Sequence, residues 1–159
     1  GDVIVMSVPL KAIPELDAGT KEALQGKIVI DTSNPYPERD GVIAEEARKE
    51  PGGMGDFVAR LLPGARIIRA FNTVYFEDLK KGLDKAGEKI GIPIAGDDQE
   101  GLSVTSELVK AAGLDPVVVG GLSTSKSFDV GTTVYATSAP ARKIREILNL
   151  KSAGSRHAA

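Results

Sequence analysis

The arrangement of apolar runs constrains the fold of this chain more than any other feature of its sequence. Five short runs rich in β-branched residues alternate with segments of helical character, and they cover residues 3–8, 27–31, 66–71, 90–95 and 116–119. Runs that are apolar on both faces are typical of buried parallel strands. The repeated order of strand, helix and strand predicts an α/β fold with a doubly wound parallel sheet and right-handed crossovers.

The clearest helix signals lie between the last two runs. Asp97 and Asp98 supply N-terminal carboxylates, an apolar face continues to about Ala112, and Gly113 follows as a stop. We therefore expect these two aspartates to cap a helix rather than to form a site. Further helices are expected at residues 10–25, 42–50, 56–62 and 139–150, whereas residues 127–137 fit either a helix or a strand. The charged residues at 45–50 predict a solvated helix face.

Length and composition limit the classes of function. The 159 residues predict one domain at residues 1–150, followed by a flexible tail at residues 151–159. A net charge of −2 without a cluster of Lys or Arg argues against a nucleic-acid partner. The chain has no Cys and one His, His157, which disfavours thiol, metal and Ser/His/Asp chemistry. No apolar run reaches the roughly 20 residues that span a bilayer, and no signal peptide is evident, so we expect a cytoplasmic protein without a membrane partner.

Small polar residues follow each predicted strand. The clusters are Ser7-Val8-Pro9, Thr32-Ser33-Asn34-Pro35, Phe71-Asn72-Thr73, Gly96-Asp97-Asp98 and Gly120-Gly121-Leu122-Ser123. Ligands of an open parallel sheet bind beyond the carboxyl ends of its strands, so all five clusters are expected at one edge. That edge would carry Ser7, Asn34, Asn72 and Gly96. Amides and hydroxyls suit hydrogen bonding to a ribose or a carboxamide better than proton transfer, although the first and last clusters are also common turn sequences.

Four segments of the chain resemble one known family. They are residues 2–9, 26–35, 62–73 and 92–98, and together they resemble the NADP oxidoreductases that depend on coenzyme F420. The wider group includes dinucleotide-binding reductases and the oxidoreductase domain of transmembrane metalloreductases. The resemblance extends to about residue 125 and implies an NAD(P)-binding Rossmann-like fold. In that family a glycine-rich turn precedes the matching segments, so the chain corresponds to the C-terminal part of the fold.

The resemblance implies a role for each matching cluster. Ser7, Val8 and Pro9 would lie along the side of the adenosine ribose and the pyrophosphate. Thr32, Ser33, Asn34 and Pro35 would lie beside the nicotinamide ribose. Phe71, Asn72 and Thr73 would flank the nicotinamide and a deazaflavin or flavin. Gly121, Leu122 and Ser123 occupy the place of a Gly-Pro-Leu turn near the second cofactor, with Gly121 in place of Pro.

These implications favour an oxidoreductase that transfers hydride between NADPH and coenzyme F420 or a flavin. Hydride transfer between two cofactors needs proximity rather than a titrating side chain, and no catalytic His, Cys or acidic pair is evident. The alternative is a non-catalytic Rossmann module that acts through self-association or a partner chain. A β-hydroxyacid dehydrogenase is disfavoured because such enzymes place a catalytic Lys on a large helical domain. The hydride acceptor, the choice of NADP over NAD and the oligomeric state stay open.

The glycine-rich pyrophosphate turn is not among these 159 residues, which leads to a prediction about affinity. Charge-assisted contacts to phosphate are about twice as strong as neutral ones, so the remaining amides and hydroxyls should hold NADPH weakly. We expect a dissociation constant on the order of 1 mM, which corresponds to about 4 kcal/mol. Calorimetry on protein of confirmed mass measures it, and micromolar affinity would contradict the reasoning.

Overall fold

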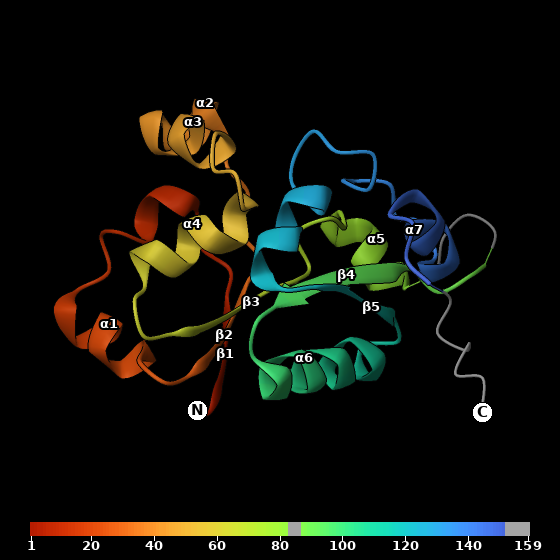
Figure 1. The fold of residues 1–159 in the computed structure, drawn as a ribbon, viewed down its shortest axis with the longest axis horizontal. Coiled ribbons are helices and arrows are strands. Elements are labelled where there is room, and N and C mark those ends of the chain that lie inside the picture. The colour runs from red at the N-terminus through yellow and green to blue at the C-terminus, as the bar shows by residue number, and fades with distance from the viewer. Residues whose placement is uncertain (83–86, 152–159) are drawn as a thin grey trace.

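The computed structural model describes residues 1–82 and 87–151, so the expected tail beyond residue 151, with His157, lies outside the described residues. Its centre is a five-stranded sheet in the order β1-β2-β3-β4-β5 (Figure 1). The strands are β1 (Val3–Met6), β2 (Ile28–Asp31), β3 (Arg66–Arg69), β4 (Gly91–Gly96) and β5 (Asp115–Gly120). The expected α/β class is confirmed, and the sheet is mostly parallel rather than wholly parallel as expected.

One strand direction differs from the sequence-based expectation. The first three strands are parallel to one another, but β4 runs antiparallel to β3, with Ile68 opposite Gly96. The connection from β3 to β4 contains the helix α5 (Phe76–Lys81), whose 6 residues span only about 9 Å. The chain does not return along the sheet, and β4 starts at the edge where β3 ends. All six residues of β4 are buried, although no parallel crossover connects it to β3.

This reversal moves two of the five polar clusters. Because β5 is parallel to β4, the carboxyl ends of both strands lie on the side of the sheet opposite to the carboxyl ends of β1, β2 and β3. Gly96 lies opposite Ile68, and the chain continues through Asp97 and Asp98 toward the start of β3, where Asp98 Oδ1 accepts a hydrogen bond from Arg66 Nη2 at 2.5 Å. The prediction that Gly96 shares an edge with Ser7, Asn34 and Asn72 is wrong.

Helices cover both faces of the sheet. Along β2 and β3, Val29 and Ile67 face one core, and Ile28, Ile30 and Ile68 face the other. The helix α4 (Gly53–Leu61) packs into the first core, and α6 (Gln99–Ala111) packs into the second. The remaining helices are η1 (Leu10–Ala12), α1 (Ala18–Leu24), α2 (Pro37–Asp40), α3 (Val42–Arg48), the 3-10 helix η2 (Leu122–Phe128) and α7 (Ala141–Ile147).

The helix expected after Asp97 and Asp98 is confirmed as α6, but only Asp98 caps it, whereas Asp97 accepts a hydrogen bond from Leu122 N. The Asp98 side chain accepts a hydrogen bond from Gly101 N at 2.6 Å, and Gly113 follows the helix with a φ of 81°. Elsewhere local signals stop the helices earlier than expected. Residues 10–25 form η1 and α1 rather than one helix, because Asp17 caps a new helix through Thr20 N after Pro14. Residues 127–137 form neither regular helix nor strand beyond the end of η2.

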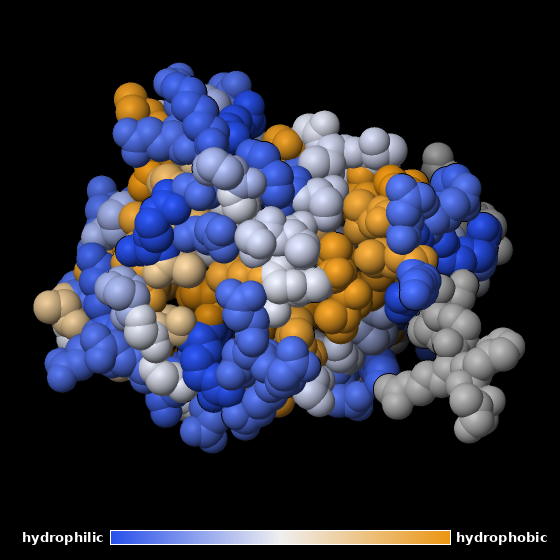
Figure 2. All heavy atoms as spheres, in the orientation of Figure 1, coloured by the Kyte–Doolittle hydropathy of each residue, from blue (hydrophilic) through white to orange (hydrophobic). Residues whose placement is uncertain are grey.

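The surface carries an apolar groove and a charged helix face. Apolar side chains gather between η2 and α7, where a groove is lined in part by Val119, Leu148 and Leu150 (Figure 2). The expected solvated face of α3 is confirmed for Glu45, Glu46, Arg48 and Lys49, which are exposed, whereas Glu50 is half-buried and pairs with Arg60. Within the described part of the chain, no helix combines the length and the apolar character needed to cross a membrane.

Candidate functional site

Two adjoining cavities open at the carboxyl ends of β1, β2 and β3. The larger has a volume of about 560 Å³ and the smaller about 190 Å³. Their walls share Ser7, Thr32, Asn34 and Tyr36. The larger volume lies within the range of small-molecule sites, and such sites favour this edge of an α/β sheet.

Nine of the ten residues expected to contact a cofactor line these cavities. Ser7, Thr32, Asn34, Phe71, Asn72 and Thr73 line the larger one, and Val8, Pro9 and Ser33 line the smaller one together with three of those residues. Pro35 lines neither. It is buried, and its carbonyl accepts a hydrogen bond from Arg48 Nε at 3.0 Å. The structure therefore brings together three of the five clusters that follow strands.

The loop at Gly121, Leu122 and Ser123 is not part of this site. Asp97 Oδ1 accepts a hydrogen bond from Leu122 N at 2.9 Å, which fixes the loop beside the end of β4. Leu122 contributes to the core beneath α4. The reversed direction of β4 and β5 explains this separation, because these two strands end at the other edge of the sheet.

A fully buried ion pair lies beneath the cavities. Arg69 and Asp31 end adjacent strands at paired positions, and both side chains are 0% exposed. Arg69 Nη1 donates to Asp31 Oδ2 at 2.8 Å, and Arg69 Nη2 donates to Asp129 Oδ1 at 3.3 Å. Burial raises the pKa of Asp31, and the charge of Arg69 opposes that rise. We assign a carboxylate to Asp31 because a guanidinium buried at hydrogen-bond distance requires a counter-charge.

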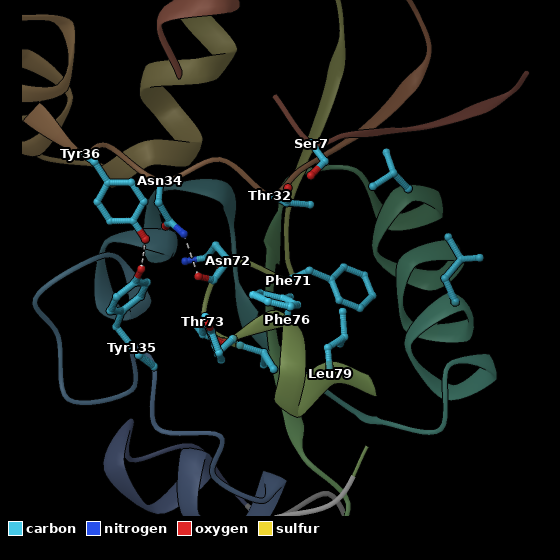
Figure 3. A pocket seen from close by; sticks show the side chains of 15 residues that line it. Ser7, Thr32, Asn34, Tyr36, Phe71, Asn72, Thr73, Phe76, Leu79 and Tyr135 are labelled. Atoms are coloured by element: carbon cyan, nitrogen blue, oxygen red, sulfur yellow. Dashed lines mark hydrogen bonds between the residues drawn. The ribbon is translucent and has the colours of Figure 1, made fainter. Parts of the chain in front are cut away.

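The ion pair also orients the amides of the site. Arg69 Nη2 donates to Asn34 Oδ1 at 3.2 Å, so the Asn34 amide nitrogen faces the next strand end. That nitrogen donates to the Asn72 carbonyl at 2.9 Å (Figure 3). Asn72 Nδ2 in turn donates to the Phe128 carbonyl at 3.1 Å. The orientation of both side-chain amides is therefore fixed by the protein.

One acceptor in this network has no partner. Asn72 Oδ1 is buried and accepts no hydrogen bond within the described chain, although Asn72 lines the larger cavity. A buried acceptor left unsatisfied costs about 1–3 kcal/mol. A ligand in the cavity that carries an N–H or O–H donor can remove that cost.

The opposite wall of the larger cavity is apolar. It comes mainly from α5, α6 and β1, through Val5, Phe76, Leu79 and Leu108, and these side chains are 37–56% exposed. Phe71, which precedes Asn72, has a φ of 61°, in the left-handed region that non-glycine residues seldom adopt. Strained residues of this kind concentrate at functional sites.

Sequence reasoning missed the aromatic residues of the site. Tyr36 and Tyr135 both line the larger cavity, and their hydroxyl oxygens are in hydrogen-bond contact (Figure 3). Tyr36 could have been found, because it follows Asn34 by two residues in a cluster already identified. Tyr135 gave no such signal, because it lies 99 residues away in the chain.

The larger cavity is lined by apolar, amide and hydroxyl-bearing side chains. None of the described residues that line the larger cavity is Asp, Glu, Lys, Arg or His. In the described part of the chain, no group of three or more His, Cys, Asp or Glu side chains could hold a metal ion. The lining can hydrogen-bond to a ligand and contact a ring, and its titratable side chains are those of Tyr36, Tyr75 and Tyr135.

The sequence and the fold of this chain are similar to those of known proteins. No known family profile matches the sequence. The metalloreductase STEAP3 of Rattus norvegicus is 27% identical over 108 residues, which are 68% of this chain and 20% of that protein. A hypothetical protein from Sinorhizobium meliloti aligns with a TM-score of 0.65 and 26% identity, over 85% of this chain and 64% of that one. A proposed F420-dependent NADP reductase from Arthrobacter sp. FB24 aligns with a TM-score of 0.64 and 21% identity, over 79% of this chain and 58% of that one.

These similarities establish the fold. The chain has the Rossmann-like α/β fold of NADP oxidoreductases, which confirms the resemblance found in the segments around the strand ends. The chain spans 20% of the length of the curated relative and 64% and 58% of the two solved structures.

The buried ion pair predicts a difference between two substitutions. Arg69→Met leaves Asp31 buried without its counter-charge, and we expect the free energy of unfolding to fall by about 3–5 kcal/mol. Asp129→Asn keeps the pair of Arg69 and Asp31, so the expected loss is about 1 kcal/mol. Urea denaturation of both variants measures the difference. Equal midpoints for Arg69→Met and the unmodified chain would show that the pair does not stabilise the fold.

Proposed function

We propose that this chain binds the nicotinamide end of NADP(H) in the larger cavity and supports hydride transfer to a second ring cofactor, coenzyme F420 or a flavin. The observation that carries the proposal is the unpartnered Asn72 Oδ1, held at a strand end beside a cavity that has an apolar wall. An oriented amide oxygen is the acceptor that a carboxamide N–H requires.

The two cavities fit the two ends of such a ligand. The larger one combines the fixed amides of Asn34 and Asn72 with a wall of exposed apolar side chains, which suits a planar ring. The smaller one is lined by Ser7, Thr32, Ser33 and the Arg39 guanidinium, which suit a ribose and an adjoining phosphate. Asp40 holds that guanidinium, since Arg39 Nη2 donates to Asp40 Oδ2 at 2.8 Å.

The cofactors supply the reactive atoms in this chemistry, and the protein supplies binding and orientation. The residues that line the larger cavity fit that division of roles because they contribute amides, hydroxyls and apolar groups, and none of them is Asp, Glu, Lys, Arg or His. The reductase names of the similar proteins from Rattus norvegicus and Arthrobacter also support it. A cytoplasmic location stays a prediction.

A second candidate function is association with another chain through β1. Among the described strands β1 pairs only with β2, and Val5 on β1 is 56% exposed. A strand at the edge of a sheet presents unpaired backbone groups that favour pairing with another strand. Dependence of the oligomeric state on protein concentration would favour this function.

Saturation-transfer NMR with NADP⁺ tests the proposed site directly. We expect the nicotinamide protons to receive more saturation from the protein than the adenine protons, because the fixed amides hold the nicotinamide inside the larger cavity. Excess nicotinamide mononucleotide should remove the signal by competition. Stronger transfer to the adenine protons, or none to either ring, would contradict the proposal.

Asn72→Ala tests the role of the amide in hydride transfer. Because the amide orients the nicotinamide and contributes little to overall affinity, we expect turnover to fall by about 100-fold while the Michaelis constant for NADPH changes little. Steady-state kinetics with saturating flavin or F420 measure both constants. Asn149→Ala, the same change at an asparagine outside the cavities, is the control. An unchanged turnover with a raised Michaelis constant would show that Asn72 acts only in binding.

A further inference from the structure

Two tyrosine hydroxyls meet at one end of the larger cavity. Tyr36 comes from the segment between β2 and α2, and Tyr135 comes from the segment between η2 and α7. Their oxygens are in hydrogen-bond contact, both side chains are partly buried, and both line the cavity (Figure 3). A contact between such distant segments forms only in the folded chain.

Separate contacts fix the positions of the two tyrosines. Tyr36 N donates to Asp40 Oδ2 at 3.1 Å, and the Arg39 guanidinium carbon lies 5.0 Å from the centre of the Tyr36 ring. On the other side, Ala136 N donates to the Thr73 carbonyl at 2.9 Å, which fixes the backbone beside Tyr135. The hydroxyl pair is therefore placed before any ligand binds.

A count of protons shows that the pair has one donor to spare. Two phenol hydroxyls carry two protons, and their mutual hydrogen bond uses one of them. Within residues 1–82 and 87–151, neither hydroxyl makes a hydrogen bond to any other group. Burial, followed by the hydrogen bond to Tyr36, raises the pKa of Tyr135, so Tyr135 keeps its proton at neutral pH.

The rest of the larger cavity limits which molecule can use that donor. Phe76, Leu79 and Leu108 form a wall that favours the face of an apolar ring. A ring bound there gains a hydrogen bond from the tyrosines only if its edge carries an acceptor. During hydride transfer the acceptor ring gains negative charge, and a carbonyl conjugated to that ring takes up part of it, where a neutral O–H donor stabilises it.

We propose that the Tyr36–Tyr135 pair donates a hydrogen bond to a ring carbonyl of the molecule that receives the hydride, and thereby selects carbonyl-bearing planar rings. The proposal rests on the function proposed above and adds a specificity-determining pair to the same site. It assigns the acceptor a chemical class, a fused planar ring with a carbonyl at its edge.

Two matched probes test the selection without any redox reaction. Anthraquinone-2-sulfonate and anthracene-2-sulfonate share a planar tricyclic frame and a charge, and only the first carries ring carbonyls. We expect the unmodified chain to bind the quinone about tenfold more tightly, the effect of one hydrogen bond. In the Tyr36→Phe/Tyr135→Phe double variant the ratio of the two dissociation constants should fall to about one.

Tyr75→Phe provides the matched control, because it removes the hydroxyl of the third tyrosine that lines the same cavity. We expect this variant to keep the tenfold ratio. Thermal unfolding shows whether each variant folds. If the double variant does not fold, the two single variants are measured, and a ratio unchanged in both overturns the proposal.

The outcomes separate this inference from the proposed function. Equal binding of both probes by the unmodified chain, or a tenfold ratio kept by the double variant, overturns the role of the tyrosines and leaves a ring-binding cavity intact. If neither probe binds and NADP⁺ shows no saturation transfer, the proposed function fails as well. Loss of the ratio in the double variant with retention in Tyr75→Phe supports the inference.

Discussion

A single buried guanidinium links the sheet to the walls of the candidate site. Arg69 is fully buried at the end of β3, and its charge is balanced by Asp31 on β2 and by Asp129 beyond η2. Because a buried charge without a partner is strongly unfavourable, the segments that carry these carboxylates must converge on it. Asp129 also accepts a hydrogen bond from Met54 N at 2.8 Å, at the start of α4. One ion network therefore joins two strands, one helix and the segment that leads to Tyr135.

The close approach of α4 to η2 depends on glycine at the first position of α4. Gly53 has a φ of 75°, and a Cβ atom there would lie 2.6 Å from both Asp129 Oδ2 and Lys126 N. Only glycine meets both requirements without displacing the backbone. The approach brings the Phe128 carbonyl to Asn72 Nδ2, at 3.1 Å. The orientation of the Asn72 amide in the cavity thus depends on a contact between segments that are far apart in the chain.

Features with local causes could be predicted from the sequence, and features with non-local causes could not. The first three strands, the cluster positions at their ends and the Asp98 cap of α6 follow from hydrophobic period and capping rules, which act within a few residues. The direction of β4 depends on the path of residues 70–90, which no local pattern specifies. The pairing of Arg69 with Asp31 has a signal in the sequence, since opposite charges end two adjacent apolar strands at the same register. Tyr135 had none, because only the folded chain brings it to Tyr36.

The two sides of the larger cavity differ in rigidity, and this difference bears on how a ligand is oriented. The polar side is fixed by hydrogen bonds that extend from the Arg69 network to Asn34, Asn72 and Phe128. The apolar side presents Phe76, Leu79 and Leu108, which are partly exposed and make contacts without directional preference. A ring can therefore slide along the apolar wall, but its polar edge has few positions that satisfy fixed donors and acceptors. Geometry for hydride transfer then depends mainly on the polar side, where the amides and the tyrosine pair lie.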